Sequence, residues 1–387
     1  MKKKICVVTS SRSEYGLLLP LLKCLKAKKE VHLDIVVTGA HLLKAFGMTY
    51  RAIIDDGFSI TSKIRIPLGD DSIAGMARAM SETLLKFTQL FQRSRPDILI
   101  LLGDRYEIFS VATAAHINRI PIAHIHGGEV TEGAIDDAFR HAITKMSMFH
   151  FTSAKAYTRR VVQLGENPGR VFTVGALGLD NMKKINLLSK ARLEKELRFK
   201  FGERNILVTF HPATLEESSA KEQCSALLEA LDSFRDIKVI FTKPGADPES
   251  GGIIELIEKY VKINKGRAAL FSSLGQQKYL SLLRFVDAVA GNSSSGIIEV
   301  PSFHIPTVNV GDRQAGRIHP DTVIECKPTK RSIEEALRLA FSRKFIKICK
   351  KAKNPYGDGT AAERIARILR NIKIPKNVKK RFFDLYV

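Results

Sequence analysis

Four short polar segments of this sequence concentrate acids, histidines, arginines and serines. They are 10–16, 103–105, 124–141 and 291–299, and each begins where a run of apolar residues ends. Carboxylates and imidazoles are the side chains that most often transfer protons at neutral pH. Arginines and the backbone N–H groups at a helix start bind anions. The combination predicts a site that holds a phosphate and moves protons beside it.

The proton-transfer candidates come mainly from the second and third segments. The run His124-Ile125-His126 also suggests a metal site, because alternate residues of a strand face one side of a sheet and two imidazoles can bind zinc. No HExxH pattern or similar motif completes such a site, so we predict no bound metal. A histidine after the apolar run that ends at Phe210 adds a titratable group from the second half of the chain. The acid/base candidates are Asp104, His126, Glu129, Asp136 and His211.

The first and fourth segments have the composition of anion-binding turns. Both contain serines just before a predicted helix, where hydroxyls, backbone N–H groups and the helix dipole favour a phosphate. Arg12 adds a planar cation to the first segment. Glu299 lies about one helical turn beyond Gly296, placed to accept hydrogen bonds from sugar hydroxyls, and Ser293 and Ser294 precede that helix. Neither GxGxxG nor GxxxxGKS/T is present, so we predict no dinucleotide cofactor and no Walker-type site.

Alternating strands and helices must position these segments. Short β-branched apolar runs recur with amphipathic stretches between them, the pattern of a parallel sheet covered by helices on both faces. The run Ile98–Leu102 is apolar throughout and predicts a buried central strand. The other predicted strands are 5–9, 33–38, 121–125, 149–152, 171–174, 205–210, 238–242, 268–271, 288–290, 307–310 and 323–326. The main predicted helices are 15–27, a stretch from His41 onward, 72–93 with Ser72 as its cap, a helix opening near Gly296, and 360–372.

The strand–helix pattern stops at 175–188 and then restarts, which predicts two domains. We place a first Rossmann-like domain at 1–178, a second, nucleotide-binding Rossmann-like domain at 179–360, and a C-terminal helix and tail at 361–387 that is able to pack back on the first domain. Open parallel sheets bind ligands outside the carboxyl ends of their strands. The predicted fold is therefore two doubly wound α/β domains with the active site in the cleft between them.

Composition excludes several classes of protein. Hydrophobic residues make up 44% and charged residues 26% of the 387 residues, a balance that fits a globular chain and excludes a disordered one. No apolar run approaches the ~18 residues of a membrane helix and the first apolar run is too short for a signal peptide, so we expect a cytoplasmic protein without a membrane partner. The five cysteines are scattered, match no zinc motif and are expected to be free thiols.

The net charge of +22 raises the question of a nucleic-acid partner. The lysines and arginines form short runs without interleaved aromatics, and the chain has no tryptophan to stack on bases. We therefore predict no nucleic-acid partner, and a positive field that attracts a small anionic substrate. A nucleic-acid-binding protein stays open as an alternative of a different class; it would bind duplex tightly and show no turnover.

Five blocks of the sequence resemble a known enzyme family. They are SRSEYG, LLGDRYE, HIHGGEVTEGAIDDAFRHAITK, TFHPAT and GNSSSGIIEVPSF, in the order and spacing of the hydrolysing UDP-N-acetylglucosamine 2-epimerases over roughly residues 4–370. The resemblance implies two Rossmann-like domains of the glycosyltransferase-B type, no cofactor, and association into homodimers or homotetramers. The implied reaction converts UDP-N-acetylglucosamine and water to N-acetylmannosamine and UDP, for bacterial sialic-acid synthesis.

The resemblance also implies roles for individual residues in these blocks. Asp104, Glu129, Asp136 and His211 are expected around the sugar, and this chain has His126 where related enzymes have a glutamate. The expected ligands of UDP are Arg12, Ser293, Ser294, Glu299 and Arg313. Two alternatives stay open: a hydrolysing 2-epimerase of UDP- or GDP-N,N′-diacetylbacillosamine on a route to legionaminic acid, and a glycosyltransferase of the same architecture.

The chemistry of C2 inversion suits these residues without the resemblance. The reaction must break a C2–H bond that no neighbouring carbonyl acidifies, and a redox route needs a nicotinamide site whose motif is absent. Elimination of UDP across C1–C2, followed by addition of water, needs anion-binding groups and proton-handling groups on opposite faces of the sugar. The candidates above supply both kinds of group, and we expect His211 and one carboxylate to transfer the protons.

Overall fold

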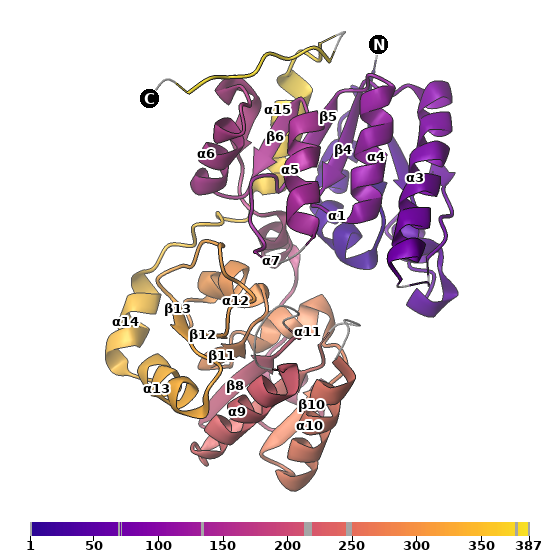
Figure 1. Cartoon of the computed structure of the whole chain (residues 1–387). Helices are drawn as coiled ribbons and strands as arrows, with labels where there is room; N and C mark the ends of the chain where they lie inside the picture. Colours follow the sequence, from indigo (N-terminus) through magenta and orange to yellow (C-terminus); the bar gives the residue numbers. More distant parts are fainter. Residues whose placement is uncertain are drawn as a thin grey trace. The chain divides into compact units, whose positions relative to one another are not determined.

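Two parallel sheets organise the chain, one in each of two units (Figure 1). The computed structural model describes residues 2–68, 70, 72–132, 135–212, 219–244, 250–375 and 378–385. Unit 1 consists of Met1–Glu129, Ala134–Asn181 and Tyr356–Val387, and unit 2 consists of Val130–Gly133 and Met182–Pro355. Because the strands of each sheet are parallel, the loops that follow them meet along one edge of that sheet.

The sheet of unit 1 has the strand order β3-β2-β1-β4-β5-β6-β7. Its strands are β1 (Lys3–Thr9), β2 (Val31–Val37), β3 (Ser62–Lys63), β4 (Ile98–Leu102), β5 (Ile122–Ile125), β6 (Phe149–Thr152) and β7 (Val171–Thr173). The strand β4 is buried along its whole length, which confirms the prediction from its apolar run. Among the described strands of this sheet, β3 alone has no predicted counterpart, because two polar residues carry no apolar pattern.

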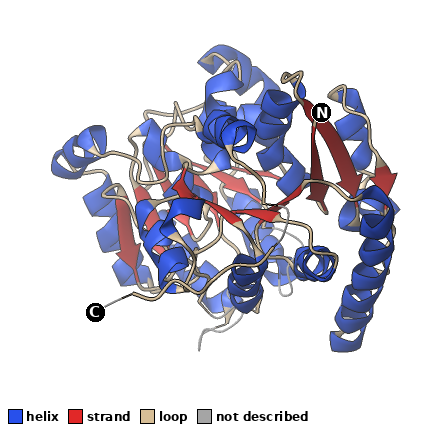
Figure 2. Cartoon of the chain, turned by 90° about the horizontal axis from the view of Figure 1, so that it is seen from above, coloured by secondary structure: helices blue, strands red, loops and turns tan. Residues whose placement is uncertain are grey.

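Helices cover both faces of this sheet, as the helices and strands of Figure 2 show. Alternate residues of β4 enter different cores: Ile98 and Ile100 pack with α1 (Arg12–Lys26) and α15 (Ala361–Asn371), whereas Leu99 and Leu101 pack with α3 (Ile73–Ser94) and α4 (Tyr106–Ile117). The remaining helices of the unit are η1 (Gly39–Leu42), η2 (Lys44–Phe46), α2 (Tyr50–Asp55), α5 (Asp136–Met146), α6 (Lys155–Gln163), η3 (Pro168–Arg170) and η4 (Leu177–Leu179), and α7 (Asp180–Lys184) begins in unit 1 and ends in unit 2.

The first helix begins earlier than predicted. It starts at Arg12 rather than Tyr15, because Ser11 Oγ caps it by accepting a hydrogen bond from the backbone N–H of Glu14 at 3.4 Å. Arg12 therefore lies in the first helical turn and not in a loop before the helix.

The stretch after His41 is not the continuous helix that the sequence predicts. It forms η1, η2 and the six-residue α2, and Gly47 at the end of η2 adopts φ +80°, which interrupts a helix. The long helix α3 is confirmed, and Ser72 Oγ caps it by accepting from the N–H of Gly75 at 3.0 Å.

The sheet of unit 2 has the order β10-β9-β8-β11-β12-β13. Its strands are β8 (Arg204–Thr209), β9 (Ile237–Thr242), β10 (Ala268–Phe271), β11 (Ala288–Gly291), β12 (Thr307–Val310) and β13 (Val323–Cys326). Its helices are α8 (Lys190–Leu197), α9 (Ala220–Asp232), α10 (Ser250–Ile263), α11 (Gly275–Leu282), α12 (Ser295–Ile298), η5 (Val300–Phe303), α13 (Lys330–Ala340) and α14 (Arg343–Lys351). The helix α8 was not predicted, because its buried residues are only Leu193 and Leu197 and carry too little apolar pattern.

The two sheets reverse their strand order at equivalent points: in each unit the fourth strand pairs with the first. In unit 1 the chain builds outward from β1 to β3 and then returns to place β4 beside β1. In unit 2 it builds from β8 to β10 and returns to place β11 beside β8. In doubly wound sheets the reversal point is where ligands bind, so ligands are expected at the loops after β1, β4, β8 and β11.

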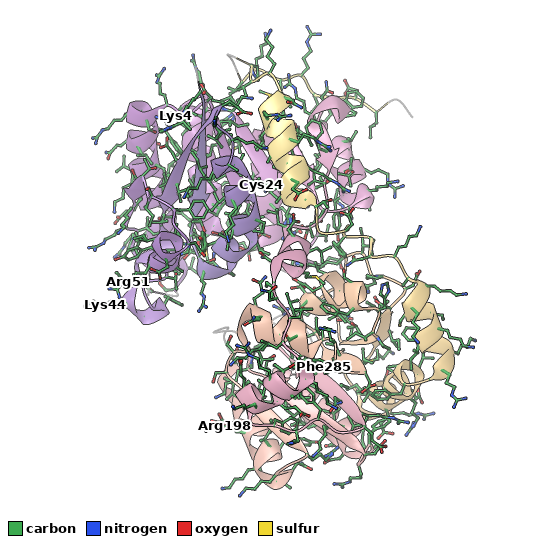
Figure 3. All side chains as sticks on the ribbon, turned by 180° about the vertical axis from the view of Figure 1, so that it is seen from behind. Lys4, Cys24, Lys44, Arg51, Arg198 and Phe285 are labelled. Carbon is green, nitrogen blue, oxygen red and sulfur yellow. The ribbon has the colours of Figure 1, made fainter. Side chains whose placement is uncertain are left out.

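The last helix packs within unit 1. Ile365 and Leu369 of α15 are buried in the same core as Leu18 and Leu22 of α1, and Cys24 lies beside this helix in Figure 3. Asp180 caps α15 by accepting the N–H groups of residues 361 and 362 at 3.0 and 2.8 Å. All five cysteines are free, as expected. Within the described residues, none of the helices combines the length and the hydropathy of a membrane span.

Candidate functional site

In unit 1 the predicted site residues follow neighbouring strands. Asp104 follows β4 and His126 follows β5, and the last residues of these two strands are paired. Gly103 makes the turn before Asp104 with φ +77°. Arg12, at the start of α1, comes after β1, the other neighbour of β4. The sheet thus brings three predicted residues to one edge.

Asp104 and Asp136 have different electrostatic surroundings. The carboxylate of Asp104 forms an ion pair with the guanidinium of Arg140, which is buried. Asp136 is the first residue of α5; burial and the negative charge of Asp104 raise the pKa of its carboxyl, and the charges of Arg105 and Arg140 oppose that rise. One carboxylate is therefore paired with a cation and the other is shifted toward its neutral form, as expected of a base and an acid in one site.

His126 and Glu129 form a second pair. Nδ1 of His126 lies 3.4 Å from Glu129 Oε1, and its Nε2 accepts the backbone N–H of Leu177 at 3.3 Å. The neutral ring therefore carries its proton on Nδ1, facing the carboxylate. Glu129 is buried and also accepts the hydroxyl of Ser153 at 2.6 Å. His126 adopts φ +66°, a conformation that non-glycine residues rarely adopt and that occurs often at functional sites.

His124 is separate from this pair. It is fully buried, its Nε2–H donates to the carbonyl of Gly103 at 2.8 Å, and its Nδ1 lies 3.1 Å from Thr144 Oγ1. Burial lowers the pKa of His124 to about 3, which keeps the ring neutral. The two histidines of the HxH run thus have different partners. In the part of the chain that the structure describes, no group of three or more His, Cys, Asp or Glu side chains is arranged to hold a metal.

A polar network that the sequence analysis missed spans the strand reversal of unit 1. Ser10 is fully buried after β1; its N–H donates to Glu14 Oε2 at 2.6 Å and its hydroxyl donates to Glu107 Oε1 at 2.9 Å. The same oxygen of Glu107 accepts Nε–H of Arg105 at 2.6 Å. Burial raises the pKa of Glu14 to about 7; the Ser10 N–H opposes this rise and the charge of Glu107 adds to it. The available signal was the S-x-x-E capping pattern of residues 11–14.

In unit 2 the buried residue Asn292 joins the loops after β8, β11 and β12, through its side chain to the first and its backbone carbonyl to the last. Its Oδ1 accepts the backbone N–H of His211 at 2.7 Å, and its Nδ2 donates to the His211 carbonyl at 2.8 Å. Its own carbonyl accepts Nη1–H of Arg313 at 3.1 Å and Nε2–H of Gln314 at 2.8 Å. Two predicted residues from distant loops therefore lie around one asparagine, next to the serines that follow it. Asn292 itself was not among the predicted site residues.

A helix begins after these serines, close to the predicted opening near Gly296, and it consists of a single turn. The helix α12 spans Ser295–Ile298, and Ser294 precedes it without a capping side-chain bond. A helix this short has a small macrodipole, so an anion here would depend on N–H groups and hydroxyls. Glu299 follows the turn; burial raises its pKa to about 7, while a hydrogen bond from Ser295 and the charge of Arg317 oppose the rise.

Comparison with known sequences decides the family. Residues 23–370 match the sequence profile described as UDP-N-acetylglucosamine 2-epimerase, which covers most of both units. The chain belongs to this family.

Relatives of this epimerase-family chain match it along almost its whole length. GDP/UDP-N,N′-diacetylbacillosamine 2-epimerase (hydrolyzing) of Campylobacter jejuni is 40% identical over 99% of this chain and 100% of its own length. Polysialic acid biosynthesis protein P7 of Escherichia coli is 39% identical over 99% of this chain and 98% of its own length.

A solved structure shows the same fold. The crystal structure of the UDP-N-acetylglucosamine 2-epimerase of Neisseria meningitidis bound to UDP-N-acetylglucosamine has a TM-score of 0.81 and 16% identity, over 95% of this chain and 100% of that chain. The two units of this family member are the two parallel-sheet α/β domains of a glycosyltransferase-B-like fold, as predicted.

The candidate residues of this epimerase-family chain form two groups. In unit 1 the strand ends position Arg12, Asp104, His126, Glu129 and Asp136. In unit 2 the loops around Asn292 carry His211, Ser293, Ser294, Glu299 and Arg313. That the two groups share one cleft stays a prediction.

Proposed function

We propose that this chain is a hydrolysing nucleotide-sugar 2-epimerase that converts UDP-N-acetylglucosamine and water to N-acetylmannosamine and UDP. The pair of carboxylates in unit 1 carries the proposal: Asp104 is paired with Arg140, and the carboxyl of Asp136 has a raised pKa. Two such groups can take a proton at one stage and return one at another. Family membership and the 40% identity to a hydrolysing 2-epimerase support the same reaction.

The proposed reaction is an elimination followed by a hydration. A base takes the proton from C2 while the bond between C1 and the UDP oxygen breaks, and a C1–C2 double bond forms. Water then adds its oxygen to C1, and a proton reaches C2 from the face opposite to the one that lost it. The configuration at C2 is inverted, and the sugar loses no hydride or electron in either step.

In this proposal some of the residues bind the nucleotide and the others transfer protons on the sugar. Arg313 and the N–H groups after Ser293 stabilise the negative charge on the departing diphosphate, together with Arg12. Glu299 accepts hydrogen bonds from the ribose hydroxyls. Asp104, His126, Glu129 and Asp136 handle protons on the sugar together with His211, which requires the two groups to face one cleft.

Turnover in D₂O tests the mechanism. We expect UDP and N-acetylmannosamine in equal amounts, with one solvent deuterium at C2 of the product, measured by mass spectrometry and proton NMR. Retention of the original hydrogen at C2 would refute the elimination. Negligible release of UDP in water, restored by a sugar acceptor, would indicate the glycosyltransferase alternative.

The relatives favour a second candidate substrate with the same mechanism. The Campylobacter jejuni protein and the UDP-N,N′-diacetylbacillosamine 2-epimerase (hydrolyzing) of Legionella pneumophila are 40% and 35% identical to this chain. Diacetylbacillosamine differs from N-acetylglucosamine by an acetamido group at C4 and a missing hydroxyl at C6. Comparing kcat/KM for UDP-N-acetylglucosamine and for UDP- and GDP-N,N′-diacetylbacillosamine decides between them; the proposal requires the first value to be the highest.

We include the cytoplasm as the location and a homodimer or homotetramer as the working form. Light scattering of the purified chain measures the oligomeric state. A fully active monomer at micromolar concentration would contradict the proposed dimer or tetramer.

A further inference from the structure

The buried carboxylate of Glu107 has no part in the proposed reaction, yet it lies beside the site. Glu107 is in the first turn of α4, shortly after Asp104, and is 1% exposed. Its Oε1 accepts the hydroxyl of Ser10 at 2.9 Å and Nε–H of Arg105 at 2.6 Å. Its Oε2 is buried and has no hydrogen-bond partner among the described residues. A buried charge is costly, so its place here calls for a reason beyond packing.

In the ion pair between Arg105 and Glu107, only the arginine is exposed to solvent. The side chain of Arg105 is 49% exposed, whereas that of Glu107 is 1% exposed. Glu107 binds Nε, which leaves Nη1 and Nη2 of the guanidinium outside this contact. Because the guanidinium is planar and rigid, a short charge-assisted bond at Nε restricts the orientation of the whole group.

The Glu107 carboxylate is itself held by Ser10, which donates to the same oxygen as Arg105. Ser10, its second partner, is fixed by its backbone: its N–H donates to Glu14 and its carbonyl accepts the N–H of His41 at 3.2 Å. The contact between Ser10 and Glu107 crosses the reversal point between β1 and β4. Glu107 therefore has little freedom to move, and the arginine that it binds is held in a fixed place.

The charge of Arg105 acts on the proposed acid. The charged groups that act on Asp136 come from several elements: Asp104 and Arg105 from the loop after β4, Arg140 from α5 and Glu107 from α4. Asp104 and Glu107 raise its pKa, and Arg105 and Arg140 lower it; the effect of Arg105 is larger than that of Glu107. The position of the Arg105 guanidinium therefore helps to set the charge of the site.

We propose that Glu107 is a positioning residue of the reaction, which acts through Arg105 by holding its positive charge beside Asp104 and Asp136. The inference rests on the proposed function for the roles of these two carboxylates. Without the charge of Glu107, Arg105 loses its charge-assisted bond, and its half-exposed side chain turns toward solvent. The site then loses a cation on which the ionisation of Asp136 depends.

The variant Glu107→Gln tests the proposal, because the direction in which the pH profile moves depends on whether Arg105 is released. Glutamine keeps the shape and an acceptor for Ser10 but removes the charge. If Arg105 is released, the alkaline limb of the pH profile of kcat/KM, which reports the acid Asp136, moves to higher pH, by roughly half a unit against the 1–3 units that a directly adjacent charge produces. If Arg105 stays in place, losing the negative charge of Glu107 moves the limb to lower pH or leaves it unchanged, which overturns the proposal.

A second background shows whether the effect passes through the arginine. In Arg105→Met, the added change Glu107→Gln should no longer move the limb upward, because no guanidinium remains to be released. An equal upward shift in both backgrounds contradicts the proposal. Melting temperature and circular dichroism show whether each variant is folded.

Glu166→Gln is the matched control. Glu166 is also a buried carboxylate of unit 1, and it accepts hydrogen bonds from Lys145 and Lys380 at 2.7 and 2.6 Å. Its replacement should lower the melting temperature and leave the pH profile in place. A shift in this control equal to that of Glu107→Gln would mean that any lost buried charge moves the profile, and would overturn the inference.

Failure of the inference and failure of the proposed function give different results. If the unaltered protein turns over nucleotide sugars but the limb does not move upward in Glu107→Gln, the function stands and the inference falls. If the unaltered protein is inactive, the function falls, and a ¹³C NMR titration of aspartate carboxyl carbons, assigned with Asp136→Asn, still decides the inference. A higher pKa of Asp136 in Glu107→Gln supports it; an equal or lower pKa overturns it.

Discussion

At the residue scale, the proposed proton-transfer groups are the sharpest test of the site. Asp104→Asn keeps the size of the side chain but removes its basicity. His211→Ala removes the imidazole of a residue whose backbone N–H and carbonyl are hydrogen-bonded to Asn292. We expect turnover to fall by roughly 10²–10⁴-fold in each, as for the loss of an acid or base. The measurement is kcat with UDP-N-acetylglucosamine, with the melting temperature recorded because Asp104→Asn also leaves Arg140 without its ion pair. Turnover of Asp104→Asn near the unaltered value would remove Asp104 from the site.

Glu299 gives a prediction about pH and nucleotide binding. Burial raises its pKa to about 7, so a large fraction is protonated in the free protein below that pH. If the ionised form accepts hydrogen bonds from UDP, binding must first release a proton, and the affinity falls as the pH falls below about 7, by at most tenfold per unit. Calorimetry of UDP binding at several pH values measures this. UDP titrates as well, so Glu299→Gln is the reference: the pH dependence should be weaker in the variant, and equal slopes would contradict the role of Glu299.

At the element scale, one buried carboxylate attaches the C-terminal segment to unit 1. Lys380 donates to Glu166 at 2.6 Å and to the carbonyl of Ser147 at 2.9 Å, and the N–H of Phe383 donates to the carbonyl of Gly165 at 2.9 Å. Burial alone would raise the pKa of Glu166, but hydrogen bonds from His150, Lys145 and Lys380 lower it to about 2. The stability that this depressed pKa gives is therefore present above the ordinary value of 4.5 and is lost as the pH falls toward 2.

Lys380→Met should release this segment. We expect the melting temperature at neutral pH to fall by roughly 2–4 °C, and the loss of stability between about pH 4.5 and pH 2 to be smaller than in the unaltered protein, because one of the groups that depress the pKa of Glu166 is gone. Thermal melts at several pH values and hydrogen exchange of residues 378–385 measure both effects. The neighbouring exposed Arg381 offers the control: Arg381→Met should leave the melting temperature within a degree, and an equal loss in both variants would mean that total charge, not this contact, is responsible.

At the scale of the whole molecule, the net charge of +22 is spread over both units. Figure 3 shows nitrogen-tipped side chains projecting outward all around the chain, Lys44, Arg51 and Arg198 among those labelled. We expect this field to speed the encounter with a doubly charged diphosphate, so kcat/KM should fall severalfold between low and physiological ionic strength while kcat changes little. Steady-state kinetics in increasing potassium chloride measure it. A constant kcat/KM would show that the charge does not steer the substrate, and tight salt-sensitive binding of random duplex would favour the nucleic-acid alternative.

Local pattern alone determined most of the strands, the restart of the strand–helix pattern after residue 188 and the identity of most candidate residues. A buried parallel strand such as Ile98–Leu102 is apolar throughout, and a polar loop must follow it, so both can be read along the chain. Elements without such a pattern escaped: β3 has two polar residues, and α8 buries only Leu193 and Leu197.

The tertiary structure alone decided which charges meet. Asp104 and Arg140 are 36 residues apart, Ser10 and Glu107 are 97 apart, and Asn292 reaches His211 across 81 residues. No local pattern specifies such pairs, because they arise where distant loops come to one edge of a sheet, and the last two pairs cross the points where the strand order reverses. The pKa values of Asp136, Glu14 and Glu299 depend on burial and on groups that only the fold brings near them. The sequence therefore identifies these acidic residues, but their ionisation follows from the tertiary structure.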